Sequence, residues 1–460
     1  MSFYVLFTLL RDWRRRLTGV GLLVFGAALS SLSIAESNAP TMLPAQGINN
    51  TASSLPVEKT ALTLRDAVQL ALQHNPELAS FAKEIQALEG VTLQAGLLPN
   101  PQLQIDLEDL GTRTDITPGG TFTSIRIGQL LETGGKRRAR RNAASLNEER
   151  AERDYEARRL DLIAQVANIF TEILAGQARL QLAQNNLVLA QKVVDAASKR
   201  VQAGKAPPIE ETRAGVTLAT AKIELEQAQR DLNAFRKQLT LLWGNPAPKF
   251  EHAAGDLESL VQIPNFDTLT ERVRVNPTAL SSQANLAQRK ANLKLQQARR
   301  LPDITVSAGI RRYAQKLDDF ESGILYDTTA LVGISVPLPL FDRNQGNLLE
   351  AHQRVDQAED QWEATDLMLK SLLAQTYEAL IAAQNEIRVL QDEILPGAKE
   401  AFMIARRGYE LGRFNFLAML DAQRALFQNQ TLYVRALANY QRLVNEIERL
   451  IAAPIESASN

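Results

Sequence analysis

The chain has 460 residues, of which 45% are hydrophobic and only 6% are aromatic. This composition excludes a disordered chain, and the aromatic content is low for a protein with one large globular core. A formal net charge of −1 gives no sign of a nucleic-acid partner. The absence of cysteine excludes disulfides, thiol catalysis, thiolate metal sites and lipid attachment at an N-terminal cysteine.

Residues 1–35 predict a secretory signal peptide. A basic region at 11–16 is followed by an apolar run at 20–29 and by small residues at 33–35, where cleavage usually occurs. A membrane anchor is the alternative, but the apolar run is much shorter than the ~20 residues of a spanning helix. Residues 36–60 are rich in Pro, Ser, Thr and Asn without periodicity, so we expect a flexible N-terminal segment there.

The remainder of the chain is a duplication. The first repeat is expected at 61–265, the second at 266–453 and a short C-terminal tail at 454–460. Each copy begins with a short helix that stops at an Asn-Pro pair, and the first of these helices is expected from Leu62. A second helix, two strands and a long helical hairpin then follow in both copies.

Strict alternation of apolar and polar residues predicts two strands in each repeat. They lie at about 101–110 and 122–131 in the first copy and at about 303–313 and 329–337 in the second. Strands of about 10 residues suit a tilted crossing of an outer membrane, whereas a soluble sheet packed on helices is the alternative. No other segment shows a strand pattern. Four strands do not close a barrel within one chain, so spanning strands require an oligomer.

The helical hairpins are expected at about 136–243 and 346–452. Apolar residues recur there at 3-4 spacing, which predicts left-handed coiled-coil packing. The outgoing helix at 136–203 would be roughly 100 Å long, and the returning helix at 209–243 only about 52 Å. We expect the helix at 77–98 to stack end to end with the returning helix and supply most of the missing length.

Each helical hairpin turns at a glycine, Gly204 in the first copy and Gly412 in the second. Glycine adopts positive φ just past a helix C-terminus at little cost. In the first copy Pro207 and Pro208 then suit the start of the next helix. The two tips are therefore expected to be the most exposed features of the helical region.

Residue clusters typical of hydrolytic or redox sites are absent from the sequence, so we expect neither an enzyme nor a cofactor. The three histidines are scattered, and with five methionines and no cysteine a soft-metal site is not expected. The segment Gly134-Gly135-Lys136 lacks the spacing and the final Ser or Thr of a phosphate-binding loop. It is better interpreted as a strand-to-helix junction.

Taken in order, several segments resemble the TolC-like outer-membrane efflux proteins, most of all the heavy-metal (CzcC-like) branch. The resemblance covers nearly all of the chain after the signal peptide and occurs in both copies. The matching segments are 64–76 (LRDAVQLALQHNP), 98–101 (LPNP), 124–136 (SIRIGQLLETGGK), 332–342 (VGISVPLPLFD) and 407–423 (RGYELGRFNFLAMLDAQ).

The resemblance implies a mainly α fold with a pair of membrane β-hairpins. A homotrimer would build a 12-stranded barrel in outer-membrane lipid, four strands per chain, above a helical periplasmic tunnel. The implied partners are a periplasmic adaptor and an inner-membrane pump of the resistance-nodulation-division type. The implied function is a passive exit duct for heavy-metal cations. Alternatives are a duct for multidrug efflux or type I protein secretion, and a periplasmic coiled-coil scaffold without a pore.

The resemblance also implies functional residues at the tips. Those matching the adaptor-docking motifs are Arg200, Val201, Gly204, Arg407, Leu411 and Gly412. Those matching the periplasmic gate are Glu210, Tyr409 and Asp421. Glu210 replaces the usual Asp and can still accept a hydrogen bond from the Tyr409 hydroxyl.

The gate departs from the family pattern in two places. The carboxylate expected one turn before Asp421 is Ala418, and the expected tip arginine is displaced to Arg413. The implied constriction therefore carries fewer charges than the resemblance would suggest. Ordinary cap and solvent-facing roles are the alternative for Tyr409 and Asp421.

Overall fold

The computed structural model of the protein describes residues 61–108, 120–316 and 324–455, all within one structural unit. The predicted signal peptide, the predicted flexible segment at 36–60 and residues 456–460 of the predicted tail lie outside the described residues. Among the described residues, none of the helices combines the length and the apolar character needed to cross a bilayer.

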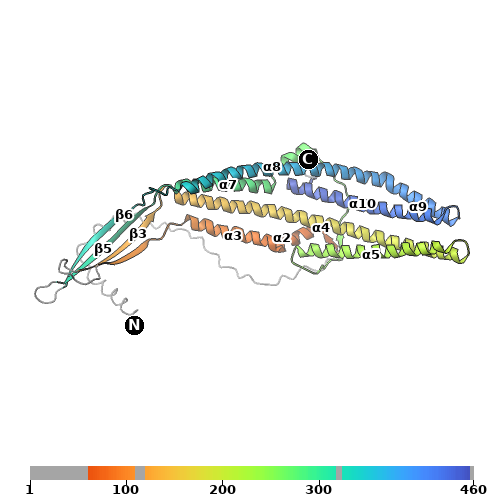
Figure 1. The fold of residues 1–460 in the computed structure, drawn as a ribbon, viewed down its shortest axis with the longest axis horizontal. Helices are drawn as coiled ribbons and strands as arrows, with labels where there is room; N and C mark the ends of the chain where they lie inside the picture. The colour runs from red at the N-terminus through yellow and green to blue at the C-terminus, as the bar shows by residue number, and fades with distance from the viewer. Residues whose placement is uncertain (1–60, 109–119, 317–323, 456–460) are drawn as a thin grey trace, which may run out of the picture. The chain divides into compact units, whose positions relative to one another are not determined.

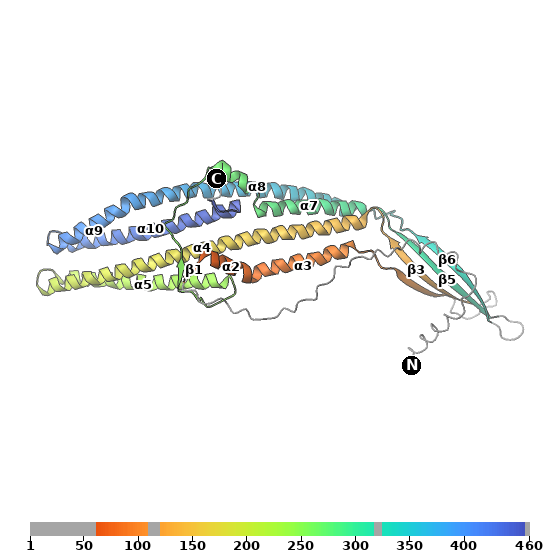
Figure 2. The ribbon, with the colours of Figure 1, turned by 180° about the vertical axis from the view of Figure 1, so that it is seen from behind.

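Helix α4 (Lys136–Gln202) is the element on which both repeats pack. Figures 1 and 2 show shorter helices following its length, among them α3 and α5 from the first repeat and α7 and α10 from the second. Helix α8 contacts α6, α7 and α10. The bounds of these helices are α2 Leu64–His74, α3 Pro76–Gly96, α5 Pro208–Leu241, α6 Phe266–Val273, α7 Pro277–Ala298, α8 Gln345–Val389 and α10 Phe416–Ile451.

Small residues let these helices approach closely. Ala183 and Ala190 on α4 and Ala221 on α5 are buried along the helix faces. A Cβ added to Gly176 on α4 would lie 3.3 Å from Leu232 Cδ1 on α5, tighter than ordinary van der Waals contact. The alanine-rich 3-4 pattern therefore acts as a close-packing device, and few aromatic side chains are needed to fill the core.

The first repeat stacks two helices end to end, as their lengths predict. Asn75 caps α3, because its Oδ1 accepts the Leu78 backbone N–H at 2.8 Å. The same side chain donates from Nδ2 to the Leu242 carbonyl at the end of α5, also at 2.8 Å. One asparagine thus satisfies the start of one helix and the end of another.

The second repeat contains the same joint. Asn276 Oδ1 accepts the Thr278 N–H at 2.8 Å, and Nδ2 donates to the carbonyls of Arg449 and Leu450 at 3.0 and 2.9 Å. The side chain is fully buried, so each of these groups would otherwise lack a partner. We call these two sites the Asn-Pro joints, at Asn75-Pro76 and Asn276-Pro277.

The sheet has the strand order β2-β3-β5-β6, with antiparallel neighbours throughout. Rows of paired residues alternate in character across it. One row is apolar and another is polar, with Asp106 also paired to Arg126 on the polar face. The strands are β2 Gln102–Glu108, β3 Gly120–Leu131, β5 Ile304–Lys316 and β6 Ile324–Ser335. The apolar row consists of Leu103, Ile127, Ala308 and Val332, and the polar row of Asp106, Ser124, Arg311 and Thr329.

The apolar face of the sheet is exposed within the chain, as Leu103, Ile105 and Val332 illustrate. Strands β2 and β6 are the outer strands, and each is paired on one side only within the described residues. The observed strands differ from the predicted ones by several residues at their ends. The largest difference is β6, which begins at Ile324 rather than near 329 because pairing with β5 extends it beyond the strictly alternating stretch.

A short parallel pair contradicts the expectation that no other segment forms strands. Strand β1 (Ala61–Thr63) pairs with β4 (His252–Ala254). Helix α2 consequently begins at Leu64 rather than Leu62, with Thr63 as its N-cap. Gln177 of α4 fixes β4 by accepting the Ala253 N–H at 2.7 Å and donating to its carbonyl at 3.0 Å. Three-residue strands are too short to show periodicity, so only the tertiary partner reveals them.

The helical path between residues 345 and 410 includes one π-helical turn, η2 (Leu390–Ile394), between α8 and α9 (Leu395–Glu410). Pro396 lies just after this turn and has no N–H to donate. A wider turn relieves the contact that a proline ring makes with the preceding helix. The chain therefore passes a proline without ending the helix.

We expect Asn276→Ala to destabilise the protein more than Asn265→Ala. Asn265 caps α6 through the Asp267 N–H at 3.4 Å, whereas Asn276 caps α7 and also binds the end of α10. The joint should add roughly 1–3 kcal/mol to a cap effect of about 1 kcal/mol. Thermal unfolding followed by circular dichroism measures the difference. Equal losses in the two variants would contradict a stabilising role for the joint.

Candidate functional site at the helix-hairpin tips

Both tips use the same backbone turn. Gly204 and Gly412 have φ values of 69° and 74°, which an L side chain rarely adopts. The N–H of Lys205 donates to the Arg200 carbonyl at 2.8 Å, and that of Arg413 to the Gly408 carbonyl at 2.7 Å. These bonds close each helix with a Schellman turn, so glycine is required for backbone reasons at both tips.

When the two turns are superposed by their hydrogen bonds, the arginines of the two tips are offset by one residue. The hydrogen bonds align Arg200 with Gly408, so Arg407 lies one position earlier and does not correspond to Arg200. Gly408 is needed because the Phe414 ring lies against it: an added Cβ would come within 2.1 Å of Phe414 Cδ2. The two arginines that the sequence placed in similar motifs therefore have different surroundings.

Tyr409 is the centre of the contact between the hairpins. Its side chain is only 3% exposed, and its hydroxyl donates to Glu210 Oε2 at 2.9 Å. The Arg200 guanidinium carbon lies 4.4 Å from the centre of the Tyr409 ring, and Arg200 Nη1 donates to the Tyr409 carbonyl at 2.6 Å. Phe416 packs on the same ring at 5.5 Å between centroids. One tyrosine thus joins α4, α5, α9 and α10.

Burial, followed by the hydrogen bond to Glu210 and its negative charge, raises the pKa of Tyr409 to about 12, while Arg200 opposes the shift. The hydroxyl therefore remains a donor at physiological pH. Arg200 Nε is buried and has no hydrogen-bond partner among the described residues. Leaving that N–H unpaired is unfavourable, so the other Arg200 contacts must compensate for it.

The remaining predicted site residues lie around this contact. Val201 is half-buried, while Gly204, Leu411 and Gly412 are exposed. The Arg407 side chain is 72% exposed and approaches only Glu410 of its own helix, at 3.5 Å, among the described residues. Asp421 is exposed on α10, outside the contact that Glu210 and Tyr409 share. The structure thus brings together two of the three predicted gate residues.

Sequence reasoning missed the buried surroundings of Tyr409. They are Val193, Ala197, Ala214, Phe416 and Met419. Only their 3-4 spacing pointed to burial, and that spacing does not distinguish a contact between hairpins from one within a hairpin.

Sequence reasoning also missed a chain of polar contacts that joins three helices near the tips. Gln423 is buried, and its Nε2 lies 3.5 Å from Asn186 Oδ1. Asn186 Nδ2 donates to Glu224 Oε2 at 3.1 Å. The three helices are α10, α4 and α5. In sequence these amide and carboxylate residues resemble solvent-facing positions, so no local signal indicates the contact.

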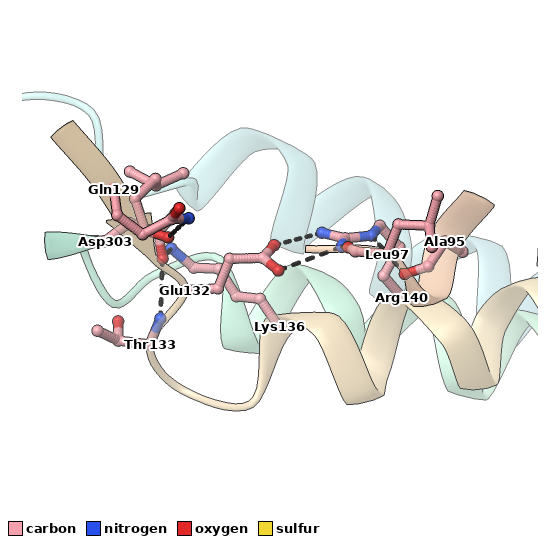
Figure 3. Close-up of polar contacts among 9 residues, drawn as sticks. Ala95, Leu97, Gln129, Glu132, Thr133, Lys136, Arg140 and Asp303 are labelled. Carbon is pink, nitrogen blue, oxygen red and sulfur yellow. Dashed lines mark hydrogen bonds and ion pairs between the residues drawn. The ribbon is translucent and has the colours of Figure 1, made fainter. Parts of the chain in front are cut away.

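The start of α4 is a second polar cluster and has a structural role. Figure 3 shows Asp303 accepting from the Thr133 N–H at 3.0 Å and from Lys136 Nζ at 2.7 Å. Burial alone would raise the pKa of Asp303, but the Lys136 and Thr133 bonds outweigh burial and lower it. The cluster ties the first repeat to the second.

Arg140 completes this junction. It pairs with Glu132 and donates to the carbonyls of Ala95 and Leu97 at 2.9 and 3.2 Å. Gly134, with φ of 63°, has Leu301 so close that a Cβ would meet it at 2.7 Å. Gly134-Gly135-Lys136 is therefore a strand-to-helix junction, as predicted. Within the described ranges, no three or more His, Asp or Glu side chains are grouped so as to hold a metal ion.

The chain matches a known family and similar proteins of known role. A family model described as outer membrane efflux protein matches residues 67–245 and 273–453. The cobalt-zinc-cadmium resistance protein CzcC of Cupriavidus metallidurans is 37% identical over 85% of this chain and 90% of that protein. The nickel-cobalt-cadmium resistance protein NccC of Alcaligenes xylosoxydans xylosoxydans is 26% identical over 64% of each.

Solved structures share the fold. The crystal structure of CusC, described in terms of folding and transmembrane channel formation, superposes with a TM-score of 0.72 at 19% identity. The match covers 85% of this chain and 92% of CusC. At this identity the likeness concerns the fold alone.

The raised pKa of Tyr409 can be measured directly. In an ultraviolet titration, the difference between wild type and Tyr409→Phe should show one phenol ionising near pH 12 rather than at the ordinary 10.0. Because the folded-state pKa is raised, the stability contributed by the neutral hydroxyl is complete below about pH 10 and is lost as the pH rises through about 12. A midpoint at the ordinary value would contradict the buried contact.

Proposed function

Because this chain belongs to the outer membrane efflux protein family, we propose that it is the exit duct of a three-part efflux system and conducts substrate passively to the exterior. The energy would come from an inner-membrane pump of the resistance-nodulation-division type, linked to the duct by a periplasmic adaptor. The contact between the two hairpin tips is the observation that carries the gating part of the proposal.

The sheet supports a barrel shared among subunits. Its apolar face is exposed, its other face carries paired charges, and β2 and β6 each have one edge that is unpaired among the described residues. In lipid the unpaired backbone groups of these edges cost several kcal/mol each. Because β2 and β6 run in opposite directions, β6 of one copy can continue the antiparallel sheet with β2 of the next. Three copies would make a closed barrel of 12 strands.

The tips support a closed duct with a docking surface. Glu210 and Tyr409 hold the hairpins together and serve as the gate in this proposal. Asp421, which is exposed on α10, is the third residue proposed for the gate. Val201, Gly204, Arg407, Leu411 and Gly412 are the residues proposed to meet the adaptor. Opening would repack α9 and α10 against α4 and α5.

Heavy-metal cations are the proposed substrate. The resistance proteins named above are metal-resistance components, and the identity of 37% to one of them extends over most of both chains. A duct does not have to hold its cargo tightly, because selection can occur in the pump. Conduction instead requires binding weak enough for the ion to leave.

The shared barrel can be tested with introduced thiols, because the chain has no cysteine of its own. Leu103→Cys on β2 is combined in turn with Val332→Cys and Ile334→Cys on β6. Oxidation should give disulfide-linked trimers for at least one pair, whereas each single-cysteine variant can link only two copies. A monomer that stays soluble without detergent would contradict the barrel and favour a coiled-coil scaffold.

The proposed substrate can be tested in the bacterium that carries the gene. Deleting the gene should lower the inhibitory concentrations of Zn²⁺, Co²⁺ or Cd²⁺ several-fold, and a plasmid copy should restore them. Susceptibility to lipophilic drugs is the control and should not change. Loss of drug resistance with unchanged metal resistance would assign the duct to multidrug efflux instead.

A further inference from the structure

Arg200 is half-buried and contacts the opposite hairpin, whereas a residue that docks the adaptor is expected to be exposed. We propose that it is a gate-positioning residue: its guanidinium holds Tyr409 of the other hairpin and so keeps the tips closed. This inference rests on the proposed channel function. It departs from the docking role that the sequence motif implies for Arg200, and it gives the two tips separate tasks.

The first argument is the hydrogen bond to the end of a helix. Arg200 Nη1 donates at 2.6 Å to the carbonyl of Tyr409, in the last turn of α9. That carbonyl also accepts the Gly412 N–H at 3.0 Å. Helix C-termini carry partial negative charge, and Arg200 itself lies in the last turn of α4. The positive guanidinium of Arg200 therefore lies at the negative end of α9, where the charge and the helix dipole attract each other.

The second argument is the aromatic contact. The guanidinium carbon is 4.4 Å from the Tyr409 ring centre, within the range of a cation–π interaction. The hydroxyl at the far end of the ring donates to Glu210 on α5. Tyr409 is thus held at three points, its carbonyl, its ring and its hydroxyl, and Arg200 supplies two of them. Without Arg200, the Glu210 bond and apolar packing are what still hold Tyr409 to the first hairpin.

The third argument is the contrast between the two arginines. Arg200 is half-buried, with Nε enclosed and unpaired among the described residues, so its side chain is directed into the protein. Arg407 is largely exposed and reaches only its own helix among the described residues. At the second tip the position equivalent to Arg200 is Gly408, which the Phe414 ring covers. The contact between an arginine of one tip and a tyrosine of the other, which we call the Arg200–Tyr409 contact, therefore occurs once per chain.

The test compares Arg200→Ala, Arg200→Lys and Arg406→Ala as trimers in planar bilayers. Arg406 is an exposed arginine near the second tip that pairs with Glu410 of its own helix, so it is the matched control. We expect Arg200→Ala to raise the conductance of the closed channel several-fold and Arg406→Ala to leave it unchanged. Arg200→Lys should be intermediate, because it keeps the charge but loses the planar group that stacks on the ring.

Measuring adaptor binding shows whether Arg200 positions the gate or docks the adaptor. Arg200→Ala should retain binding to the purified adaptor, while Arg407→Ala should weaken it. Wild-type conductance of Arg200→Ala combined with lost adaptor binding would overturn the proposal. If wild type and Tyr409→Phe never conduct under any condition, the channel function fails instead, and the conductance result no longer bears on Arg200.

A second measurement is independent of conductance. The phenol titration of Tyr409 is repeated in Arg200→Ala, with Arg200→Ala/Tyr409→Phe as its reference. If Arg200 holds the ring in place, its removal exposes the phenol and moves the midpoint down towards 10. If Arg200 only contributes a positive charge, its removal moves the midpoint up, and the proposal is overturned. Circular dichroism confirms that the variants are folded.

Discussion

The length of α4 is the constraint on which the rest of the structure depends. A helix from Lys136 to Gln202 extends roughly 100 Å, and no single returning helix in the described part of the chain matches it. An uncovered apolar stripe of that length would be unstable, so each repeat supplies two helices in series. The Asn-Pro joints make this possible because one buried asparagine satisfies two helix ends at once. The first β-strand pair and the first tip are then held at opposite ends of one continuous element.

The two ends of α4 use polar groups in different ways. At the strand junction, Asp303, Lys136, Glu132 and Arg140 form paired charges that tie loops to helices. At the tips, charge is concentrated around one aromatic ring, with a cation on its face and a carboxylate at its hydroxyl. The charges at the strand junction favour a contact that stays closed, because each of them has a partner of opposite charge. The arrangement at the tips leaves Arg200 Nε without a hydrogen-bond partner among the described residues, which lowers the net stability of the closed contact and makes it easier to exchange for another.

Duplication explains the common framework and also the differences at the tips. Both copies retain the Asn-Pro joint, the β-hairpin and the glycine turn, because each solves a backbone problem that is the same in both. The side chains around the turns differ: Arg200 and Gly408 occupy equivalent positions, as do Val201 and Tyr409. An identical second tip would have valine in place of Tyr409, so Arg200 would lose the aromatic ring and the Glu210 carboxylate would lose the hydroxyl. The asymmetry is therefore useful at the point where the hairpins meet.

The amino-acid sequence was enough to predict the features that depend on local periodicity and backbone conformation. Alternation in the strands, 3-4 spacing in the helices, Pro after Asn at the joints and glycine at positive φ all follow from neighbouring residues, and the resemblance correctly paired Glu210 with Tyr409. The π-helical turn before Pro396 was missed although its cause is local, whereas the three-residue strand β1 is revealed only by its pairing with β4. The contact of Arg200 with Tyr409 and the burial of Gln423 could be found only from the tertiary structure. These side chains meet partners more than 200 residues away, and an arginine in a motif looks the same whether its guanidinium turns to solvent or to the opposite hairpin.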